Sequence, residues 1–403
     1  MTSSLSMERL ILTGALLLDG TGGPPVSGRA VVVERGRIGA VVSAANPPSG
    51  TTLHLDGLTL LPGLINMHVH LCFGGEADPG TVMLREPFPM TVIRAALRAR
   101  QTVEAGVTTV RDLGGRDYAE LSVRDAIRGG LIPGPRVLCA GRGICMTGGH
   151  GWSLIGREAD GPDDVRKAVR EQLKAGADVI KIFATGGVMT AGVEPNSAQL
   201  TLDEVRAAIE EARKAGRRTA AHAMGSDGIV NCLEGGITTI EHGVYLTEAL
   251  CERMAREGVA LVPTLIAPAA IAAGGVAAGI PEYAVRKSLA VADRHLEGFR
   301  MALRAGVAIA AGTDAGTPCN PHGTLVPELA LMVKGGMTPG AAVHAATAVA
   351  ARALGLEHET GRIAPGLAAD LLAVDGNPAE RVEALDEVRL VIAQGRVTVN
   401  RLK

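Results

Sequence analysis

Residues 62–70 read Pro-Gly-Leu-Ile-Asn-Met-His-Val-His, a short apolar run that ends in two histidines separated by a single valine. An apolar run of this length behind a Pro-Gly turn is typical of a buried β-strand. Because side chains at positions i and i+2 of a strand point to the same face, His68 and His70 are expected to project together. This stretch therefore predicts a buried strand that presents two imidazoles at its C-terminal end.

Similar strand patterns recur through the middle of the chain and alternate with amphipathic helical stretches, as expected for βα units around a parallel sheet. The candidate strands are 63–70, 107–113, 136–141, 179–184, 218–223, 238–243, 260–265 and 307–313. Typical helices between them are 92–105, 162–175, 202–215 and 246–257. Thr201 and Glu204 form a capping-box pattern at the start of one of these helices.

Eight βα units predict an α/β fold of the (β/α)8 TIM barrel type over residues 63–356. A doubly wound open sheet is the alternative. It is disfavoured because no G-x-G-x-x-G motif follows the first strand.

Short apolar runs also fill both ends of the chain. The candidates are 11–18, 30–34, 38–42, 53–55 and 58–61 on one side and 370–374, 388–393 and 396–399 on the other. Neither end alone could bury a sufficient core. We therefore expect residues 1–62 and 357–403 to form one small β-sandwich domain, with the barrel inserted between its two parts.

The composition disfavours some classes of protein, in particular proteins that bind nucleic acid. The 40 Lys and Arg residues nearly balance the 42 Asp and Glu residues, and aromatic residues make up only 2% of the chain. These values disfavour a nucleic-acid partner, which would need basic surface or stacking side chains. The six cysteines form no C-x-x-C pair, and no stretch is typical of a membrane span or a cleaved signal, so we expect a cytoplasmic protein with a small-molecule substrate. The sequence leaves a homo-oligomer open.

Chemistry-bearing side chains stand at the C-terminal ends or within several of the predicted strands. They are His68, His70, Lys181, His222, His242 and Asp314. Singly, each has a structural explanation: a buried histidine can be satisfied in a core, a lysine can extend to solvent and an aspartate can cap a turn. Together they coincide with five strand ends of one barrel, where active sites of this fold are built. The set therefore predicts a metal site.

Five of these segments resemble signatures of the amidohydrolase superfamily of metal-dependent hydrolases. They are residues 62–70, Val-Ile-Lys-Ile at 179–182, Ala-His-Ala at 221–223, Ile-Glu-His-Gly at 240–243 and Gly-Thr-Asp-Ala-Gly at 312–316. Thr-Gly-Gly-His-Gly at 147–151 and Glu-His-Gly-Val-Tyr at 241–245 resemble the prolidase/carboxypeptidase-type branch, which is similar to imidazolonepropionases. Asn66 departs from the aspartate that often precedes H-x-H in the family, and we expect little consequence because this position is not a ligand there.

The resemblance implies two divalent metal ions, expected to be zinc. His68, His70, Lys181 and Asp314 would hold one ion, and Lys181, His222 and His242 the other. Burial near metal favours a neutral lysine amine, which can add carbon dioxide, so a carbamylated Lys181 is expected to bridge the ions. The helper glutamate of single-metal deaminases is missing after His222, which favours a two-metal hydrolase.

This site implies hydrolysis by metal-activated hydroxide, with Asp314 as the catalytic group that moves the proton. The expected substrate is a small N-acyl amino acid or dipeptide, as for a carboxypeptidase or dipeptidase. His150 and Tyr245 are the main substrate-binding candidates, and Trp152, Arg157 and His322 are weaker ones. The remaining histidines are assigned no role; they are His54, His295, His344 and His358. The alternatives are a cyclic amide, as in imidazolonepropionase, a lactone or another ester, and, from another class, a non-catalytic scaffold.

Overall fold

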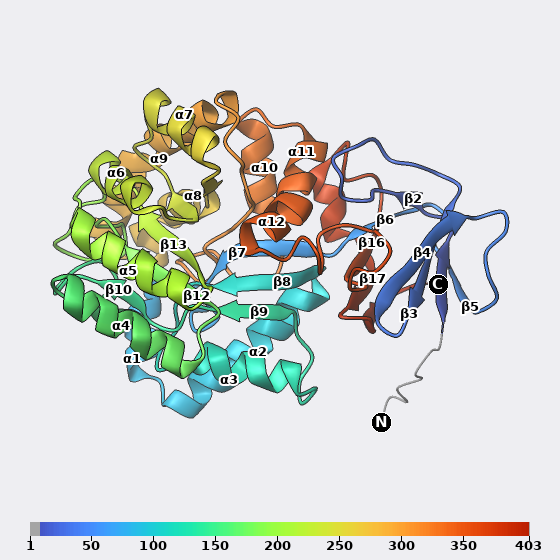
Figure 1. Cartoon of the computed structure of the whole chain (residues 1–403), viewed down its shortest axis with the longest axis horizontal. Helices are drawn as coiled ribbons and strands as arrows, with labels where there is room; N and C mark the ends of the chain where they lie inside the picture. The colour runs from blue at the N-terminus through green and yellow to red at the C-terminus, as the bar shows by residue number, and fades with distance from the viewer. Residues whose placement is uncertain (1–8, 403) are drawn as a thin grey trace.

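The computed structural model describes residues 9–402 as a mixed α/β fold. Parallel strands and their helices form the larger part, and strands from the two ends of the chain lie side by side next to it (Figure 1). Among the described residues, no helix combines the length and the apolar character that crossing a bilayer requires.

The parallel strands form two sheets. The first joins β7 (Leu64–Val69), β8 (Val107–Asp112) and β9 (Arg136–Cys139). The second has the order β11 (Gly156–Glu158), β10 (Gly143–Cys145), β12 (Val179–Phe183), β13 (Arg218–Ala223), β14 (Thr239–His242) and β15 (Ala260–Val262). Most of these strands are buried along their length, as expected for parallel sheets covered by helices.

Backbone contacts continue from one sheet to the other on both sides. The Asp178 N–H donates to the Cys139 carbonyl (2.8 Å), which connects the start of β12 to β9. On the other side, Ile309 bridges to Leu261 of β15 and Ala315 bridges to Val69 of β7, both in parallel orientation. The segment 307–315 therefore lies between β15 and β7.

The predicted strand over 307–313 is wrong as a continuous strand, because this segment makes only isolated bridges. The Asn66 side chain explains part of the interruption. Its Oδ1 atom accepts the Thr313 N–H (3.1 Å) in place of a backbone carbonyl, and its Nδ2 donates to Thr313 Oγ1 (2.8 Å). The Asn66 side chain thus orders the segment that leads to Asp314.

Helices follow most of the parallel strands (Figure 1). Their bounds are α1 (Pro79–Arg85), α2 (Phe88–Glu104), α3 (Ala119–Arg128), α4 (Pro162–Ala175), α5 (Leu202–Lys214), α6 (Ser226–Gly235), α7 (Glu248–Glu257), α8 (Ile266–Gly274), α9 (Glu282–Arg304), α10 (Val326–Lys334), α11 (Pro339–His344) and α12 (Ala350–Leu354), with short turns η1 (Val276–Ala278), η2 (Ala345–Val349, a π-helix) and η3 (Val382–Asp386). The capping box at Thr201 and Glu204 is confirmed. Val165 of α4 and Val205 of α5 pack with Ile180 of β12 in the main core.

The ends of the chain build two further sheets. One has the order β4 (Arg37–Ser43), β3 (Arg29–Glu34), β1 (Leu10–Thr13), β5 (Thr51–His54), and the other β18 (Arg396–Asn400), β17 (Val388–Ala393), β16 (Leu371–Asp375), β6 (Leu58–Pro62), β2 (Leu16–Leu17). The antiparallel pairing of β6 with β16 joins residues from both ends of the chain. Leu12, Val31, Leu60, Leu371 and Ile392 share one core between the sheets.

The predicted single strand 11–18 is interrupted at Gly14, where the backbone is left-handed (φ 88°). A Cβ atom at this position would lie 2.4 Å from Asp56 Oδ1, so glycine allows the chain to approach the 55–57 turn closely. The break divides the run into β1 and β2, which belong to different sheets.

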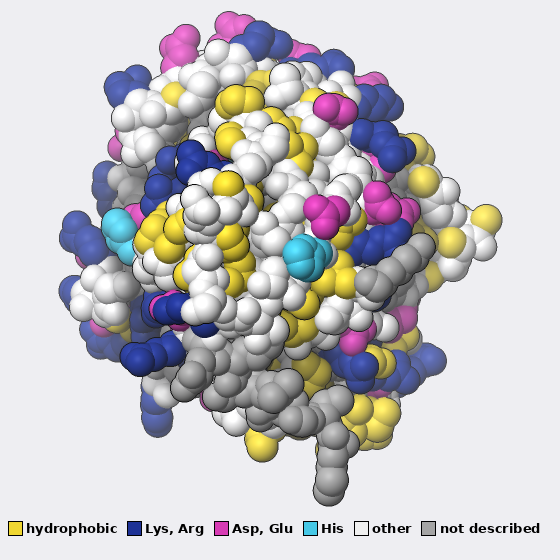
Figure 2. Space-filling view, turned by 90° about the vertical axis from the view of Figure 1, so that its right-hand side faces the viewer, with side chains coloured by type: hydrophobic (Ala, Val, Ile, Leu, Met, Phe, Trp, Pro, Cys, Tyr) yellow, Lys and Arg dark blue, Asp and Glu magenta, His cyan; other side chains and the backbone are white. Residues whose placement is uncertain are grey.

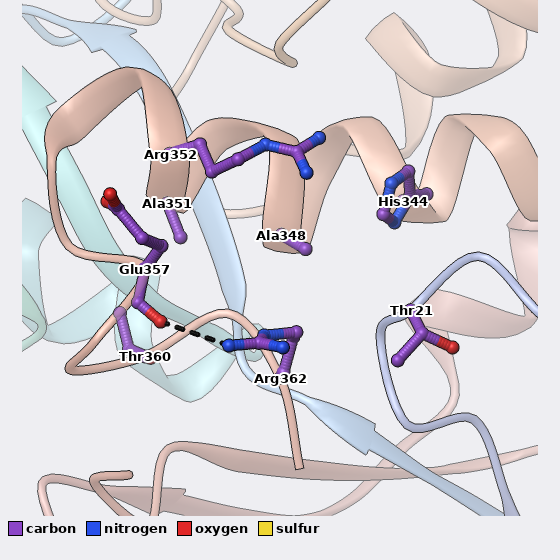
Figure 3. Close-up of a pocket in the computed structure, with 8 residues that line it drawn as sticks. All are labelled: Thr21, His344, Ala348, Ala351, Arg352, Glu357, Thr360 and Arg362. Carbon is purple, nitrogen blue, oxygen red and sulfur yellow. Dashed lines mark hydrogen bonds between the residues drawn. The ribbon is translucent and has the colours of Figure 1, made fainter. Parts of the chain in front are cut away.

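The end of the molecule with the chain-end strands has a mixed surface. In Figure 2, basic and acidic side chains are interspersed there and hydrophobic side chains form small groups. A cavity of about 270 Å³ lies between the 19–23 loop, the α11–α12 helical run and residues 357–362 (Figure 3). His344, at its rim, donates from Nδ1 to the Gly20 carbonyl (3.0 Å) and so connects the loop to the helices.

Candidate metal centre

Four of the predicted ligands, His68, His70, His242 and Asp314, lie close together near the point where β7 meets the 307–315 segment. His68 and His70 are buried, and their Nε2 atoms lie 3.4 and 3.2 Å from Asp314 Oδ1. Ligand atoms of His68, His242 and Asp314 all lie within 4.8 Å of one another. This triangle is the size of a metal coordination site.

The remaining predicted ligands surround that triangle. The His222 ring centre is 4.6 Å from that of His242, on the neighbouring strand β14. Lys181 lies in the middle of β12, opposite Ala220 of β13, and is 1% exposed. Within residues 9–402, its amino group forms neither a hydrogen bond nor an ion pair, which is unusual for a buried cation.

Each of the four histidines is oriented by an oxygen at one ring nitrogen. His68 Nδ1 donates to Glu241 Oε2 (2.9 Å), His70 Nδ1 to the Gly114 carbonyl (2.9 Å) and His222 Nε2 to the Gly186 carbonyl (2.9 Å). His242 Nδ1 lies 2.7 Å from Thr264 Oγ1. An oxygen that only accepts fixes the ring proton, as for His68, His70 and His222, and so directs the second nitrogen of the neutral ring toward the site.

The backbone at two candidate ligands is strained. His242 (φ 73°) and Asp314 (φ 56°) are left-handed, and so is Thr264 (φ 52°), which contacts the His242 ring. Left-handed backbone is unfavourable for residues with a side chain and tends to persist at functional sites. The left-handed backbone sets the direction of the His242 and Asp314 side chains where their segments end.

Burial and neighbouring charges together determine the protonation of the imidazoles. Burial lowers the pKa of His68 to about 4 and that of His222 and His242 well below the usual value. Burial would also lower the pKa of His70, but the Asp314 carboxylate outweighs it and raises that pKa. Burial also lowers the pKa of Lys181, to about 8. Burial alone would raise the pKa of Asp314, but His68 and His70 outweigh it and hold that pKa below its usual range.

These observations fit a divalent metal ion. At neutral pH, His68 is uncharged and its only ring proton is directed at Glu241, so the Nε2 lone pair faces the Asp314 carboxylate at 3.4 Å. Two electron-rich atoms at this distance repel each other unless a cation lies between them. Neutral imidazoles with a carboxylate form a donor set suited to zinc and similar ions.

Glu241 and Arg111 belong to the site but were not among the sequence candidates. Glu241 is fully buried and accepts from Arg111 Nη2 (2.7 Å) as well as from His68. Burial opposes ionisation, but Arg111 and His68 outweigh it and lower the pKa of Glu241 to about 2. The available signal was an acidic residue next to His242 in a buried strand, together with an arginine in the apolar 107–113 run.

A loop over the site is held by helix α9. Lys287 is buried and donates from Nζ to the carbonyls of Gly187 (3.2 Å), Thr190 (2.8 Å) and Val193. The same loop supplies the Gly186 carbonyl that orients His222. Lys287 therefore determines where this part of the loop lies.

The predicted substrate residues have different surroundings. The His150 ring centre lies 4.4 Å from that of His222, and its Nδ1 is 2.8 Å from Thr190 Oγ1. Burial lowers the pKa of His150 to about 3. Tyr245 is half-buried and packs against an apolar cluster that includes Met224 and Val244.

The weaker candidates lie elsewhere in the structure. The Arg157 guanidinium is bound to Asp164 (3.1 Å) and Glu171 (2.8 Å), which neutralise its charge and occupy its donors. Trp152 is 46% exposed. His322 is half-buried and its Nε2 donates to the carbonyls of His70 (3.1 Å) and Phe73 (2.8 Å), so it supports the chain after β7.

His295, which received no role, lies on α9 and is buried. Its Nε2 is shared between the carbonyls of His242 (3.0 Å) and Pro263 (2.7 Å). It therefore supports the strand end that carries a candidate ligand.

The sequence model of the amidohydrolase family matches residues 59–398. This chain belongs to the amidohydrolase family. The family is generally metal-dependent, and the convergence of His68, His242 and Asp314 accords with that property. The expectation of a hydrolase acting on C–N bonds is confirmed.

Individual relatives within the amidohydrolase family support the same assignment. Ochratoxinase from Aspergillus niger is 33% identical over 416 residues, which cover 94% of this chain and 84% of that protein. Imidazolonepropionase from Salinispora arenicola is 29% identical over 402 residues, 93% of this chain and 92% of that protein. A crystal structure of a prolidase complexed with N-methylphosphonate-L-proline has a TM-score of 0.90 and 30% identity, and covers 98% of this chain and 100% of that one.

Proposed function

We propose that this chain is a binuclear metal-dependent amidohydrolase that cleaves the amide or peptide bond of a small N-acyl amino acid or dipeptide. The observation that carries the proposal is the convergence of His68, His242 and Asp314 within 4.8 Å, with His222 and Lys181 beside them. Five imidazole, carboxylate and amine groups at one end of parallel strands exceed what one four-coordinate ion requires.

The proposed architecture is a (β/α)8 TIM barrel over residues 63–356 and a β-sandwich from residues 1–62 and 357–403. The contacts of Asp178 with Cys139, Ile309 with Leu261 and Ala315 with Val69 support a closed ring of strands. The shared core of the two chain-end sheets supports the sandwich.

In the proposed site, His68, His70, Lys181 and Asp314 would hold one zinc ion, and Lys181, His222 and His242 the other, with Lys181 carbamylated. Bound divalent ions would supply Lewis acidity, which lowers the pKa of water and polarises a carbonyl group. The Lys181 amino group lies 5.4 Å from the centre of the Phe183 ring and has no hydrogen bond within residues 9–402. This setting and its pKa of about 8 support the carbamate, since only the neutral amine adds carbon dioxide.

The chain's own residues would perform the remaining steps. The Asp314 carboxylate is ionised at neutral pH, so it can accept a proton from the attacking water and deliver it to the leaving nitrogen. Glu241 keeps the His68 ring in one orientation. His150 is the proposed contact for the substrate carbonyl or carboxylate, and Tyr245 is proposed to line the same pocket.

The prolidase complex supports a substrate that ends in an amino acid, because the ligand of that structure contains L-proline. The alternative is a cyclic amide, favoured by the 29% identity to imidazolonepropionase, or a lactone or other ester. A small-molecule substrate in the cytoplasm, without a nucleic-acid or membrane partner, remains the expected setting.

The test combines metal analysis with a substrate panel. Elemental analysis of the active enzyme should find close to two divalent ions per chain, and a single ion would contradict the binuclear site. Dipeptides and N-acyl amino acids should be cleaved, and blocking the free carboxylate as an amide should lower kcat/KM about ten- to a hundred-fold through a lost charge-assisted hydrogen bond. Activity confined to cyclic amides or lactones would instead establish the alternative.

A further inference from the structure

A second cavity, of about 370 Å³, lies at the opposite end of the parallel strands from the candidate metal centre. The first residues of β9, β12 and β13 line it: Arg136, Val179 and Arg218. The other wall is formed by residues 353–356, at the end of α12. His222 and His242 stand at the C-terminal ends of their strands and do not line this cavity. Arg111 does line it, and its contact with Glu241 connects the cavity to the metal centre.

The cavity is strongly cationic. Its lining contains five arginines, Arg111, Arg128, Arg136, Arg217 and Arg218, but Asp178 is its single carboxylate. Two of the arginines are neutralised: Arg111 by Glu241 (2.7 Å) and Arg136 by Asp370 (2.8 Å). The Asp178 carboxylate forms its short ion pair with Arg124 (2.8 Å). Arg128 therefore has only a longer contact with Asp178, of 3.4 Å.

Arg217 and Arg218 have no carboxylate of their own. Within the described part of the chain, neither guanidinium takes part in an ion pair or a hydrogen bond, and both residues are exposed. Adjacent positive charges around one cavity repel each other, and an anion between them would remove that repulsion. The excess of guanidinium groups therefore points to a negatively charged ligand.

Arg218 is positioned by backbone contact. A Cβ atom at Gly355 would lie 2.6 Å from Arg218 Nε. The Arg218 guanidinium therefore packs on the backbone of Gly355, and a residue with a side chain there would displace it. Gly355 also has a left-handed backbone (φ 74°), which ends α12. One face of the guanidinium is thus supported.

We propose that this cavity binds a small organic oxyanion with two or more negative charges, at a site separate from catalysis. Guanidinium groups match the oxygens of phosphates and carboxylates through paired N–H donors, and fixed arginines recognise both classes. A volume of about 370 Å³ is in the range of small-molecule sites and exceeds what an inorganic ion fills. A phosphate ester and a dicarboxylate share this chemistry.

Calorimetric titration of the metal-loaded enzyme with glucose 6-phosphate and with succinate tests the proposal and separates the two sources of charge. At least one of them should bind saturably, whereas glucose should not. The double substitution Arg217→Gln and Arg218→Gln changes exposed side chains and should weaken binding at least about tenfold, the usual scale for lost charge-assisted hydrogen bonds. Arg300→Gln, on an exposed part of α9, is the matched control and should leave binding unchanged.

Failure of both anions to bind at low salt would overturn the proposal. So would binding that the double substitution leaves intact, since this would place the anion elsewhere, including at the metal centre. Because Arg217 and Arg218 are remote from the candidate ligands, the outcome is independent of whether the proposed amide hydrolysis is correct.

Discussion

Glu241→Gln should destabilise the protein and weaken metal binding together. Glu241 and Arg111 are 0% and 1% exposed, and their side chains meet at 2.7 Å. The two carboxylate oxygens accept from three groups: Arg111 and Thr239 at Oε1, and His68 at Oε2. Glutamine offers one acceptor oxygen, and its NH₂ group would face another donor.

The expected loss follows from the burial of the pair. Removing one partner of a buried ion pair leaves an uncompensated charge and typically costs about 3–5 kcal/mol. We expect about 3 kcal/mol, at the lower end, because the glutamine oxygen can still accept the two hydrogen bonds made at Oε1. Groups that orient a metal ligand typically contribute ten- to a hundred-fold in affinity, so metal binding should weaken by about tenfold.

Urea unfolding at fixed metal concentration measures the stability, and titration with a competing chelator measures the affinity. Glu210→Gln, an exposed glutamate of α5, is the control and should change the free energy of unfolding by less than about 0.5 kcal/mol. A second variant, Arg111→Met with Glu241→Leu, removes both charges and should recover much of the loss. If Glu241→Gln lost less than about 1 kcal/mol and kept its metal affinity, the assigned role of this pair would be refuted.

Three further outcomes are expected. Lys287→Met should lower kcat/KM about tenfold in steady-state kinetics, because three loop carbonyls lose their donor. Lys287→Arg should recover part of this loss, and unchanged kinetics in Lys287→Met would show that the lysine is structural only. Burial raises the pKa of Glu328 to about 8, so folding favours its protonated form and wild-type stability should fall as pH rises from about 4.5 to 8. In Glu328→Gln that slope, up to about 1.4 kcal/mol per pH unit, should disappear from unfolding curves, and an equal slope in both proteins would contradict the shift. Lys181→Ala should lose metal and activity together and regain part of both with added acetate, whereas full activity at normal metal content would exclude a bridging role.

Local sequence patterns predicted the individual elements well. The structure has α4 at 162–175, β13 at 218–223 and β17 at 388–393, the bounds that periodicity and turn residues indicated. Apolar periodicity depends only on residues that are close in sequence. It therefore predicts the bounds of an element well where the same pattern of burial continues along the whole element. The H-x-H spacing at His68 and His70 likewise predicted that both rings approach Asp314.

Features that depend on distant residues were not predictable. Glu241 and Arg111 are 130 positions apart. Each is a charged residue in an apolar run, but the sequence does not indicate that the two pair with each other. The 307–313 run has strand composition, but the Asn66 side chain takes one of its backbone donors. Arg157 was predicted as a possible donor to an anionic substrate, since spacing alone does not show that Asp164 and Glu171 of the following helix bind it.

The pairing of β6 with β16 has a consequence for biosynthesis. Pro62 lies opposite Leu371, so the sheet that contains β6 cannot be completed until the ribosome has added about 300 residues after β6. Until then, Leu60 lacks Leu371 and Ile392, which share its core in the finished protein. Contacts between such distant residues form slowly because a long loop must close first. While those residues are being made, the nascent chain would expose the apolar strand β6, a state that favours aggregation and chaperone binding.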